Sequence, residues 1–268
     1  MKTTDSILET NKKQKEFYNN FKQNSFTKLW ARLRNGILTK IRKNIGLQDQ
    51  SYVLHKQWFG DLSDKKVLDL GCFSGNYLSL YLAENSKSYL GIDLSDVAIA
   101  KLDQRLKHLP NANAAAVDFL SSDFTETNFD LIYAYGVLHH FENTQILIDK
   151  LNEKLADGGT IISYDPLETS IPIKILRTLY RPFQSDAEWE WPFTKKTFRK
   201  FESAFTILER RGVLGKSKWM TFVNVLPFSD KRKEEIGKKW HQHDWDKSKD
   251  SDKVLFSCMH LTMFMKKK

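Results

Sequence analysis

The segment 67–76, which reads VLDLGCFSGN, constrains the fold of this chain more than any other part of the sequence. It is an apolar run with the composition of a β-strand, and it ends in a turn bounded by Gly71 and Gly75 before a helical pattern begins. About one strand–helix unit later, a second apolar run ends in the carboxylate of Asp93. A strand, a glycine-bounded turn and an acid at the tip of the next strand are typical of a site for a nucleoside cofactor.

Apolar runs and helical patterns alternate along the middle of the chain. We expect strands at 66–70, 89–93, 114–118, 129–135 and 160–164, and helices at 76–84, 96–108 and 144–155. Further along, we expect a helix at 194–203, a strand at 205–212, an exposed helix or loop at 228–252 and a final strand within 253–265. Strands separated by helices imply right-handed crossovers and a mostly parallel sheet.

Residues 26–45 have the pattern of a basic amphipathic helix. Apolar residues recur there at intervals of three and four, and lysines and arginines lie between them. Two interpretations stay open: a helix packed on the main domain, or an element at a membrane surface or over the substrate. With a further helix expected at 51–60, the sequence predicts a helical cap at residues 1–58 and a main domain at 59–268.

The overall composition excludes several classes of protein. In 268 residues no apolar run approaches the roughly 18 residues that a membrane-spanning helix needs, and the polar start of the chain lacks the pattern of a secretory signal. Two cysteines do not make a disulfide framework, so we expect a reduced, cytoplasmic protein, with a peripheral place at a membrane as the alternative. The net charge of +9 permits an acidic partner and equally suits a generic basic surface.

Residues at the expected strand ends have the chemistry that a nucleoside requires. Asp93 can accept hydrogen bonds from both hydroxyls of a ribose. Asp118 can accept from the exocyclic amine of adenine, and Phe119 can cover the ring. The free N–H groups at the start of helix 76–84 suit an anionic group. The glycine spacing differs from the G-x-G-x-x-G of dinucleotide-binding proteins, which leaves a carboxylate as the alternative to a pyrophosphate.

A pair of histidines follows the strand expected at 129–135. Histidine is the side chain that most readily exchanges a proton near neutral pH, so His139 or His140 can deprotonate a hydroxyl or an amine. The alternative is that both pack or cap the loop. A second pair, His241 and His243, stands in a charged segment, where we expect solvated side chains and no metal ion.

Four motifs, taken together, resemble a known family. They are the residues 67–75, 91–95 and 135–141, and the pattern Leu155-x-x-Gly158-Gly159. Their order and spacing closely resemble those of the class I S-adenosylmethionine-dependent methyltransferases, above all the branch that methylates small molecules, quinones and lipids. The resemblance covers roughly residues 60–165. It implies an α/β fold: a Rossmann-like, doubly wound, seven-stranded and mostly parallel sheet with a reversed last hairpin and added N-terminal helices.

The resemblance also implies which residues hold the cofactor S-adenosylmethionine and its product S-adenosylhomocysteine. The residues expected at the methionine end share one strand and turn: Asp69, Gly71, Cys72 and Gly75. Leu94 would lie against the adenine, and Tyr135 would lie under the sulfonium. Phe73 departs from the family, which usually has glycine there, and its side chain either narrows the methionine end or points away.

We therefore expect an enzyme that transfers a methyl group in line to a small-molecule acceptor, by O- or N-methylation. His139 or His140 would act as the base, and Tyr135 would position the acceptor. We expect the insertion at 166–200, which is rich in aromatic residues, to form a lid after the fifth strand. The residues predicted to contact the acceptor are Tyr18, Glu188, Trp189 and Trp191.

Three alternatives stay open. A peripheral membrane enzyme acting on lipids or isoprenoids is suggested by residues 26–45. An RNA or protein methyltransferase would use the positive charge, but the sequence lacks an Asn/Asp-Pro-Pro-Tyr-type motif and an appended RNA-binding module, so we do not expect a nucleic acid partner. A protein that binds S-adenosylmethionine without catalysis is suggested by Phe73 alone.

Overall fold

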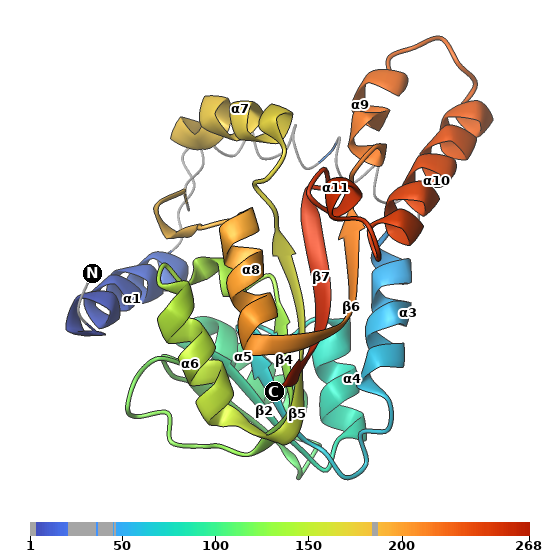
Figure 1. Cartoon of the computed structure of the whole chain (residues 1–268). Helices are drawn as coiled ribbons and strands as arrows, with labels where there is room; N and C mark the ends of the chain where they lie inside the picture. Colours follow the sequence, from blue (N-terminus) through green and yellow to red (C-terminus); the bar gives the residue numbers. More distant parts are fainter. Residues whose placement is uncertain (1–3, 21–35, 37–44, 46, 184–186) are drawn as a thin grey trace.

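The sheet is the organising element of this fold. The computed structural model describes residues 4–20, 36, 45, 47–183 and 187–268. The strands within them are β1 (Lys66–Leu70), β2 (Ser88–Asp93), β3 (Ala112–Ala116), β4 (Phe129–Tyr135), β5 (Leu155–Pro166), β6 (Phe205–Val213) and β7 (His260–Lys267). They form one seven-stranded sheet in the order β3-β2-β1-β4-β5-β7-β6 (Figure 1).

Strand directions confirm the expected fold class. The five strands from β3 to β5 pair in parallel, whereas β7 pairs antiparallel with both β5 and β6. The sheet is therefore mostly parallel and ends in a reversed hairpin, as predicted. The strand order reverses where β1 pairs with β2 on one side and with β4 on the other. In open parallel sheets, ligands bind in the crevice outside the carboxyl ends of the strands at such a reversal.

Two layers of helices bury the sheet. On the face with Val67 and Tyr133 pack α3 (Leu47–Phe59), α4 (Tyr77–Asn85), α5 (Asp96–Leu106) and α10 (Asp230–Lys247). On the face with Leu68 and Ile132 pack α6 (Thr144–Lys154), α8 (Lys195–Ala204) and the short α11 (Asp252–Leu255). Successive residues of a strand enter opposite clusters, because their side chains point to opposite faces. Both faces are apolar, as expected for a parallel sheet between helices.

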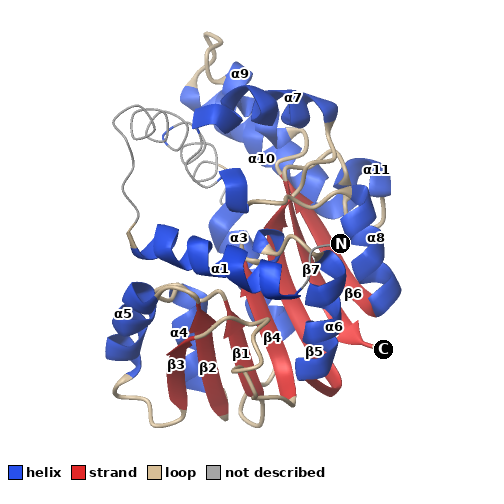
Figure 2. Cartoon of the chain, turned by 90° about the vertical axis from the view of Figure 1, so that its left-hand side faces the viewer, coloured by secondary structure: helices blue, strands red, loops and turns tan. Residues whose placement is uncertain are grey.

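Three further helices lie beyond the carboxyl ends of the strands. They are α1 (Thr4–Asn19), α7 (Ile171–Tyr180) and α9 (Met220–Val223) (Figures 1 and 2). Figure 2 shows α1 lying across the ends of the parallel strands. Of the helices that the structure describes, none is both long and apolar enough to cross a membrane.

Polar caps fix where the helices after the strands begin. The side chains of Asn76, Ser95, Asn143 and Thr194 each accept a hydrogen bond from an N–H of the first turn that follows. Such caps satisfy donors that have no partner within the helix. Asn76 accepts from two N–H groups of α4, those of Leu78 and Ser79. We expected the N–H groups at the start of this helix to be free for an anionic ligand. For the N–H groups of Leu78 and Ser79 that expectation is wrong.

Several boundaries differ from those expected. β3 ends at Ala116, so Asp118 follows the strand instead of closing it. β5 is longer than predicted because it pairs with β4 from Leu155 and with β7 as far as Pro166. β7 starts only at His260, because Ser251 caps the short helix α11 within the segment that was expected to be strand.

Two other predictions concern helical segments. The basic helix expected at 26–45 lies outside the described residues, except for Gly36 and Ile45. His241 belongs to α10, where it is buried and its Nε2 lies 2.6 Å from Oε1 of Gln50. The expectation of a solvated His241 is therefore wrong, because α10 packs this side of the helix on the core.

Candidate active site

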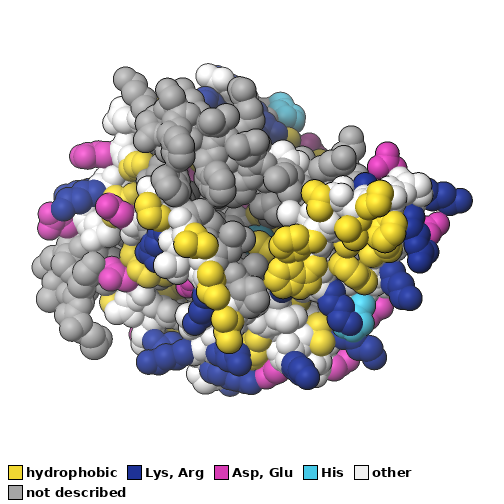
Figure 3. All heavy atoms as spheres, turned by 90° about the horizontal axis from the view of Figure 1, so that it is seen from above, with side chains coloured by type: hydrophobic (Ala, Val, Ile, Leu, Met, Phe, Trp, Pro, Cys, Tyr) yellow, Lys and Arg dark blue, Asp and Glu magenta, His cyan; other side chains and the backbone are white. Residues whose placement is uncertain are grey.

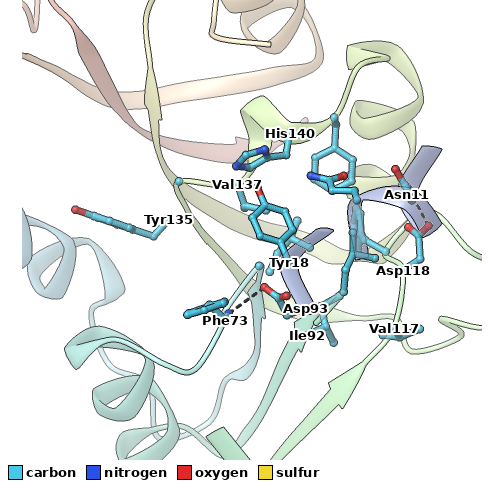
Figure 4. Close-up of a pocket in the computed structure, with 17 residues that line it drawn as sticks. Asn11, Tyr18, Phe73, Ile92, Asp93, Val117, Asp118, Tyr135, Val137 and His140 are labelled. Carbon is cyan, nitrogen blue, oxygen red and sulfur yellow. Dashed lines mark hydrogen bonds between the residues drawn. The ribbon is translucent and has the colours of Figure 1, made fainter. Parts of the chain in front are cut away.

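A cavity of about 270 Å³ opens at the carboxyl ends of β1, β2 and β4, on the reversal of strand order (Figure 4). The residues that line it and were predicted from the sequence are Tyr18, Gly71, Phe73, Asp93, Leu94, Asp118, Phe119, Tyr135 and His140. The lining also includes Asn11, Gln14, Leu70, Ile92, Val117, Gly136, Val137 and Phe141. The predicted residues outside the lining are Asp69, Cys72, Gly75, His139, Glu188, Trp189 and Trp191.

The turn after β1 is shaped by backbone conformations that favour glycine. Gly71 has a φ of 69°, and a Cβ at this position would collide with the side chain of Val137. The turn is also held from outside, because Nη1 of Arg105 donates to the carbonyls of Ser74 and Gly75 at 2.6 Å each. Arg105 was not predicted, since nothing in its local sequence distinguishes it from the other basic residues of α5.

Phe73 is the unusual residue of this turn. Its φ of 49° lies in the left-handed region, which side chains with a Cβ rarely occupy. The side chain is 56% exposed and lines the cavity, so it neither fills the core nor points away from the site. Figure 4 shows its ring beside Asp93. Phe73 therefore forms part of the cavity wall where a glycine would leave space.

Asp93 stands at the end of β2, between the glycine turn and the next loop. Its Oδ2 accepts from the N–H of Phe73 at 3.0 Å, and its Oδ1 accepts from the N–H of Ser95 at 2.9 Å. Burial raises the pKa of this carboxyl above its ordinary value, against the effect of these bonds. Each carboxylate oxygen accepts more than one hydrogen bond, so Asp93 retains acceptor capacity for a diol in the cavity.

Asp118 and Phe119 form the opposite side of the cavity. Oδ1 of Asp118 accepts from the N–H of Leu120 at 2.9 Å, and Oδ2 accepts from Nδ2 of Asn11 at 2.8 Å. Phe119 is almost fully buried, and its ring meets that of Phe141 edge to face, with 6.0 Å between the centroids. The carboxylate of Asp118 therefore borders an apolar slot that the rings of Phe119 and Phe141 line.

The helix α1 covers the cavity. Asn11, Gln14 and Tyr18 face it from one side of the helix. Nζ of Lys15 lies 2.9 Å from Oδ1 of Asp96, and Oγ of Ser95 donates to Oδ1 of Asn19 at 2.8 Å. The polar residues of α1 thus join the loops that follow β2 and β3. Asn11 and Gln14 were missed by the sequence reasoning, because only the folded chain brings α1 to this edge of the sheet.

Asp69 lies behind the turn and not in the cavity. It is almost fully buried, and the hydroxyl of Tyr89 donates to its Oδ2 at 2.8 Å. Burial raises its pKa to about 6. Cys72 is buried beside it and has a free thiol, whose pKa burial raises well above the ordinary value. Both residues support the wall of the cavity from within.

The two histidines occupy different environments. His140 lines the cavity, and its Nδ1 lies 2.7 Å from the carbonyl oxygen of Trp189. A carbonyl only accepts, so Nδ1 carries a hydrogen and, in a neutral ring, Nε2 is the basic nitrogen. His139 is buried, and its Nδ1 lies 2.9 Å from Oδ1 of Asp165. The two rings are 4.1 Å apart, so His139 packs directly beneath His140.

The remaining predicted residues surround this pair. Tyr18 meets the ring of His140 edge to face, with 6.2 Å between the centroids. The ring of Tyr135 stacks on Tyr164 at 4.8 Å, and Figure 4 shows it directed away from Asp93. Trp191 contributes its backbone, because its N–H donates to the carbonyl of His139 at 2.7 Å. The segment of the predicted lid around Trp189 and Trp191 is thus attached to the histidine loop by one main-chain bond and by the side chain of His140.

Comparisons with known proteins agree with this geometry. Residues 68–161 match the family model of a methyltransferase domain. A tRNA U34 carboxymethyltransferase of Pseudoalteromonas atlantica is 31% identical over 182 residues, which are 63% of this chain and 55% of that protein. An uncharacterized protein of Haemophilus influenzae is 31% identical over 114 residues, which are 38% of this chain and 42% of that protein. The chain thus spans about half the length of these curated relatives.

A solved structure shows the same fold. It is the geranyl diphosphate C-methyltransferase of Streptomyces coelicolor A3(2), in complex with Mg²⁺, geranyl diphosphate and S-adenosylhomocysteine. The TM-score is 0.57 at 9% identity, over 89% of this chain and 86% of that one. The narrower branch acting on small molecules, quinones and lipids stays a prediction. Residues 68–161 match the model of a methyltransferase domain, and the chain shares the fold of this Streptomyces coelicolor methyltransferase.

Proposed function

We propose that this protein transfers the methyl group of S-adenosylmethionine to a small-molecule acceptor. The observation that carries the proposal is the position of Asp93. Its carboxylate stands in the cavity at the reversal of strand order, between a glycine turn and an apolar slot. That is where an α/β sheet of this kind holds a ribose.

The chemistry of the cavity fits this cofactor. Asp93 and Asp118 are acceptors, while the hydroxyls of a ribose and the exocyclic amine of adenine are donors. Leu94, Phe119 and Phe141 supply the apolar surfaces that the adenine ring requires. The glycine turn and Phe73 border the remaining space, which would take the methionine end. When bound, the cofactor supplies an electrophilic methyl group.

The residues of this chain would align the acceptor and accept its proton. His140 lines the cavity, and its bond to the carbonyl of Trp189 directs the basic Nε2 away from that carbonyl. We assign the role of base to His140 and a positioning role to His139, which is bound to Asp165 beneath it. Tyr135 and Tyr18 border the same space and would orient an O- or N-nucleophile. Alignment and exclusion of water supply most of the acceleration in such a transfer.

An RNA substrate is the second candidate. The names of several curated relatives and the net charge of +9 support it. The lining of the cavity argues against a carboxymethyl donor, which would bring an additional carboxylate. Among the described residues that line the cavity there is no Lys or Arg to pair with that charge. We therefore favour an ordinary methyl donor and a small acceptor.

Isothermal titration with S-adenosylmethionine and S-adenosylhomocysteine tests the cofactor. We expect micromolar binding of both and at least about tenfold weaker binding to Asp93→Ala, because a buried charged acceptor is lost. Asp103→Ala, an exposed acid on α5, is the matched control and should bind as the wild type does. Far-UV circular dichroism of each variant checks that the fold is retained. Absence of binding by the folded wild type would contradict the proposal.

A labelling assay then separates the two acceptor classes. Wild-type protein with methyl-labelled cofactor is offered unmodified total tRNA in one reaction and a panel of phenols, amines, quinones and lipids in another. Label in the small molecules supports the proposal. Label in tRNA, lost on raising the salt concentration, would establish the second candidate instead.

A further inference from the structure

Two elements beyond the sheet expose apolar side chains that the core does not use. On α7, Ile171, Ile175 and Leu179 are 72%, 58% and 69% exposed. After β6, Phe222, Val225 and Leu226 are 63%, 81% and 44% exposed. We call these six residues the apolar rim. Scattered exposed apolar residues are ordinary in a folded protein, but a continuous patch of them marks a surface that meets another apolar phase.

The apolar rim is a regular feature of the fold. Ile171, Ile175 and Leu179 follow one another at intervals of four, so they lie along one side of α7. Phe222 belongs to α9, and Val225 and Leu226 follow it directly in the loop before α10. Figure 3 shows hydrophobic side chains gathered on this end of the molecule.

The topology places the rim on the same edge as the cavity. α7 follows the carboxyl end of β5, and α9 follows the carboxyl end of β6. These two strands run in the same direction, because each pairs antiparallel with β7. β5 is in turn parallel to β4, at whose carboxyl end the cavity opens. Figure 1 shows α7 and α9 both beyond this edge, at separate places along it.

Basic residues predominate around the rim. Residues 169–183 include Lys174, Arg177 and Arg181 and no acidic residue. Residues 214–229 include the exposed Lys216 and no acidic residue, whereas Lys218 is partly buried and its Nζ donates to the carbonyl of Ser257 at 2.6 Å. On α10, Glu234 lies 2.6 Å from Nζ of Lys238 and Glu235 lies 3.4 Å from Nη1 of Arg232, whereas Asp230 in the first turn is an exposed acid. A basic surface around an apolar one is complementary to an anionic interface.

We propose that the apolar rim docks this protein on an anionic membrane surface. The apolar side chains would enter the boundary between headgroups and acyl chains, and the lysines and arginines would meet the lipid phosphates. This arrangement faces the cavity edge towards the bilayer. The docking does not depend on methyl transfer; only its consequence, an acceptor taken from the lipid phase, rests on the proposed function.

Co-sedimentation with lipid vesicles tests the proposal without cofactor or acceptor. The full chain is mixed with vesicles of phosphatidylcholine alone and with vesicles that also contain phosphatidylglycerol. We expect binding to the anionic vesicles and at least about tenfold weaker binding to the neutral ones. Because the assay contains no S-adenosylmethionine, its failure is distinguishable from failure of the proposed function.

Two double variants locate the contact. Phe222→Ser with Val225→Ser, and Ile175→Ser with Leu179→Ser, each remove two exposed side chains that the core does not need. We expect each pair to weaken binding to anionic vesicles by at least about tenfold. Leu208→Ser is the matched control, since Leu208 is 46% exposed on the edge strand β6 away from the rim. It should bind within about twofold of the wild type.

Three results would overturn the proposal: no sedimentation of the wild type with anionic vesicles, equal sedimentation of the wild type and both double variants, or an oligomer in solution that the double variants dissociate. The last result would assign the rim to a second copy of the chain. Size-exclusion chromatography with light scattering measures it on the same samples.

Discussion

At the scale of single residues, neither the backbone conformation nor the ring of Phe73 stabilises the folded chain. Its φ of 49° is unfavourable for a residue with a Cβ, and its ring is more than half exposed on the cavity. Strain of this kind persists where the surroundings impose it, and it often coincides with a functional site. Phe73 lines the cavity near Asp93, and on the proposed function its ring would border the methionine end of the cofactor.

Two substitutions of Phe73 separate the effect of its backbone conformation on stability from the effect of its aromatic ring. We expect Phe73→Gly to raise the free energy of unfolding by about 1 kcal/mol, because glycine adopts a positive φ without strain. Phe73→Ala keeps the strain and removes the ring, so it should show no such gain. Urea unfolding measures both variants. Equal stability of the Gly and Ala variants would contradict this account.

The buried carboxyl of Asp69 makes stability depend on pH. Burial raises its pKa to about 6 in the folded protein, above the ordinary value of 3.8 that it has in the unfolded chain. Between these values the folded state binds more protons, so the free energy of unfolding falls as the pH rises, by about 3 kcal/mol in total.

Asp69→Asn should remove this contribution. The amide stays neutral, and its oxygen still accepts from Tyr89. Urea unfolding at about pH 4 and about pH 7 is expected to show the variant gaining stability relative to the wild type at the higher pH. Asp103→Asn is the control for an exposed acid. A constant difference between wild type and Asp69→Asn at both pH values would show that Asp69 keeps its ordinary pKa.

His140 is the residue on which the chemistry of the proposal depends. With an acceptor in hand, we expect His140→Ala to lower kcat by about 10²-fold or more and to leave the affinity for S-adenosylmethionine unchanged. His139→Ala should have the smaller effect on kcat, since His139 lies outside the cavity and acts through His140. Unchanged turnover of His140→Ala would remove the base from the mechanism.

At the scale of secondary structure elements, α1 has the largest influence on the site. It approaches from the far end of the sequence and joins the loops after β2 and β3 through Asn11, Lys15 and Asn19. Gln14 of the same helix is buried in the contact. Polar residues of α1 therefore border one side of the cavity.

Breaking these contacts should weaken cofactor binding. We expect the double variant Asn11→Ala, Asn19→Ala to bind S-adenosylmethionine roughly tenfold less tightly, because each lost hydrogen bond contributes about 1 kcal/mol. The matched control is Lys13→Ala. Its side chain is exposed and pairs with Glu9 of the same helix, so its loss should leave affinity unchanged. Titration calorimetry measures both, and equal affinities would show that α1 does not contribute.

At the scale of the whole molecule, the sequence predicted the sheet and half of the site. The motif residues Gly71, Asp93, Asp118 and His140 follow parallel strands, whose carboxyl ends meet at one edge, so their meeting in one cavity follows from the topology. Local patterns alone predict such an arrangement, because each motif is contained in a single strand–loop unit.

The residues of the site that the sequence did not predict are brought there by contacts between segments far apart in the chain. Asn11 meets Asp118 across more than a hundred residues, and no periodic pattern signals that pairing. The sequence slightly favoured His139 over His140 as the base, whereas in the folded chain Asp165 holds His139 outside the cavity that His140 lines. Trp189 and Trp191 meet the histidine loop through their backbone carbonyl and N–H, which carry no side-chain signature, and their contact with an acceptor stays a prediction.

The placement of α1 also has a kinetic consequence. The helix lies over the cavity and is attached to the loops on both sides of it. We expect a ligand held underneath to leave more readily when those attachments open, so that its residence time depends on the opening rate of α1 as well as on its own contacts. For the proposed function, we expect the N-terminal helix to control the release of the product.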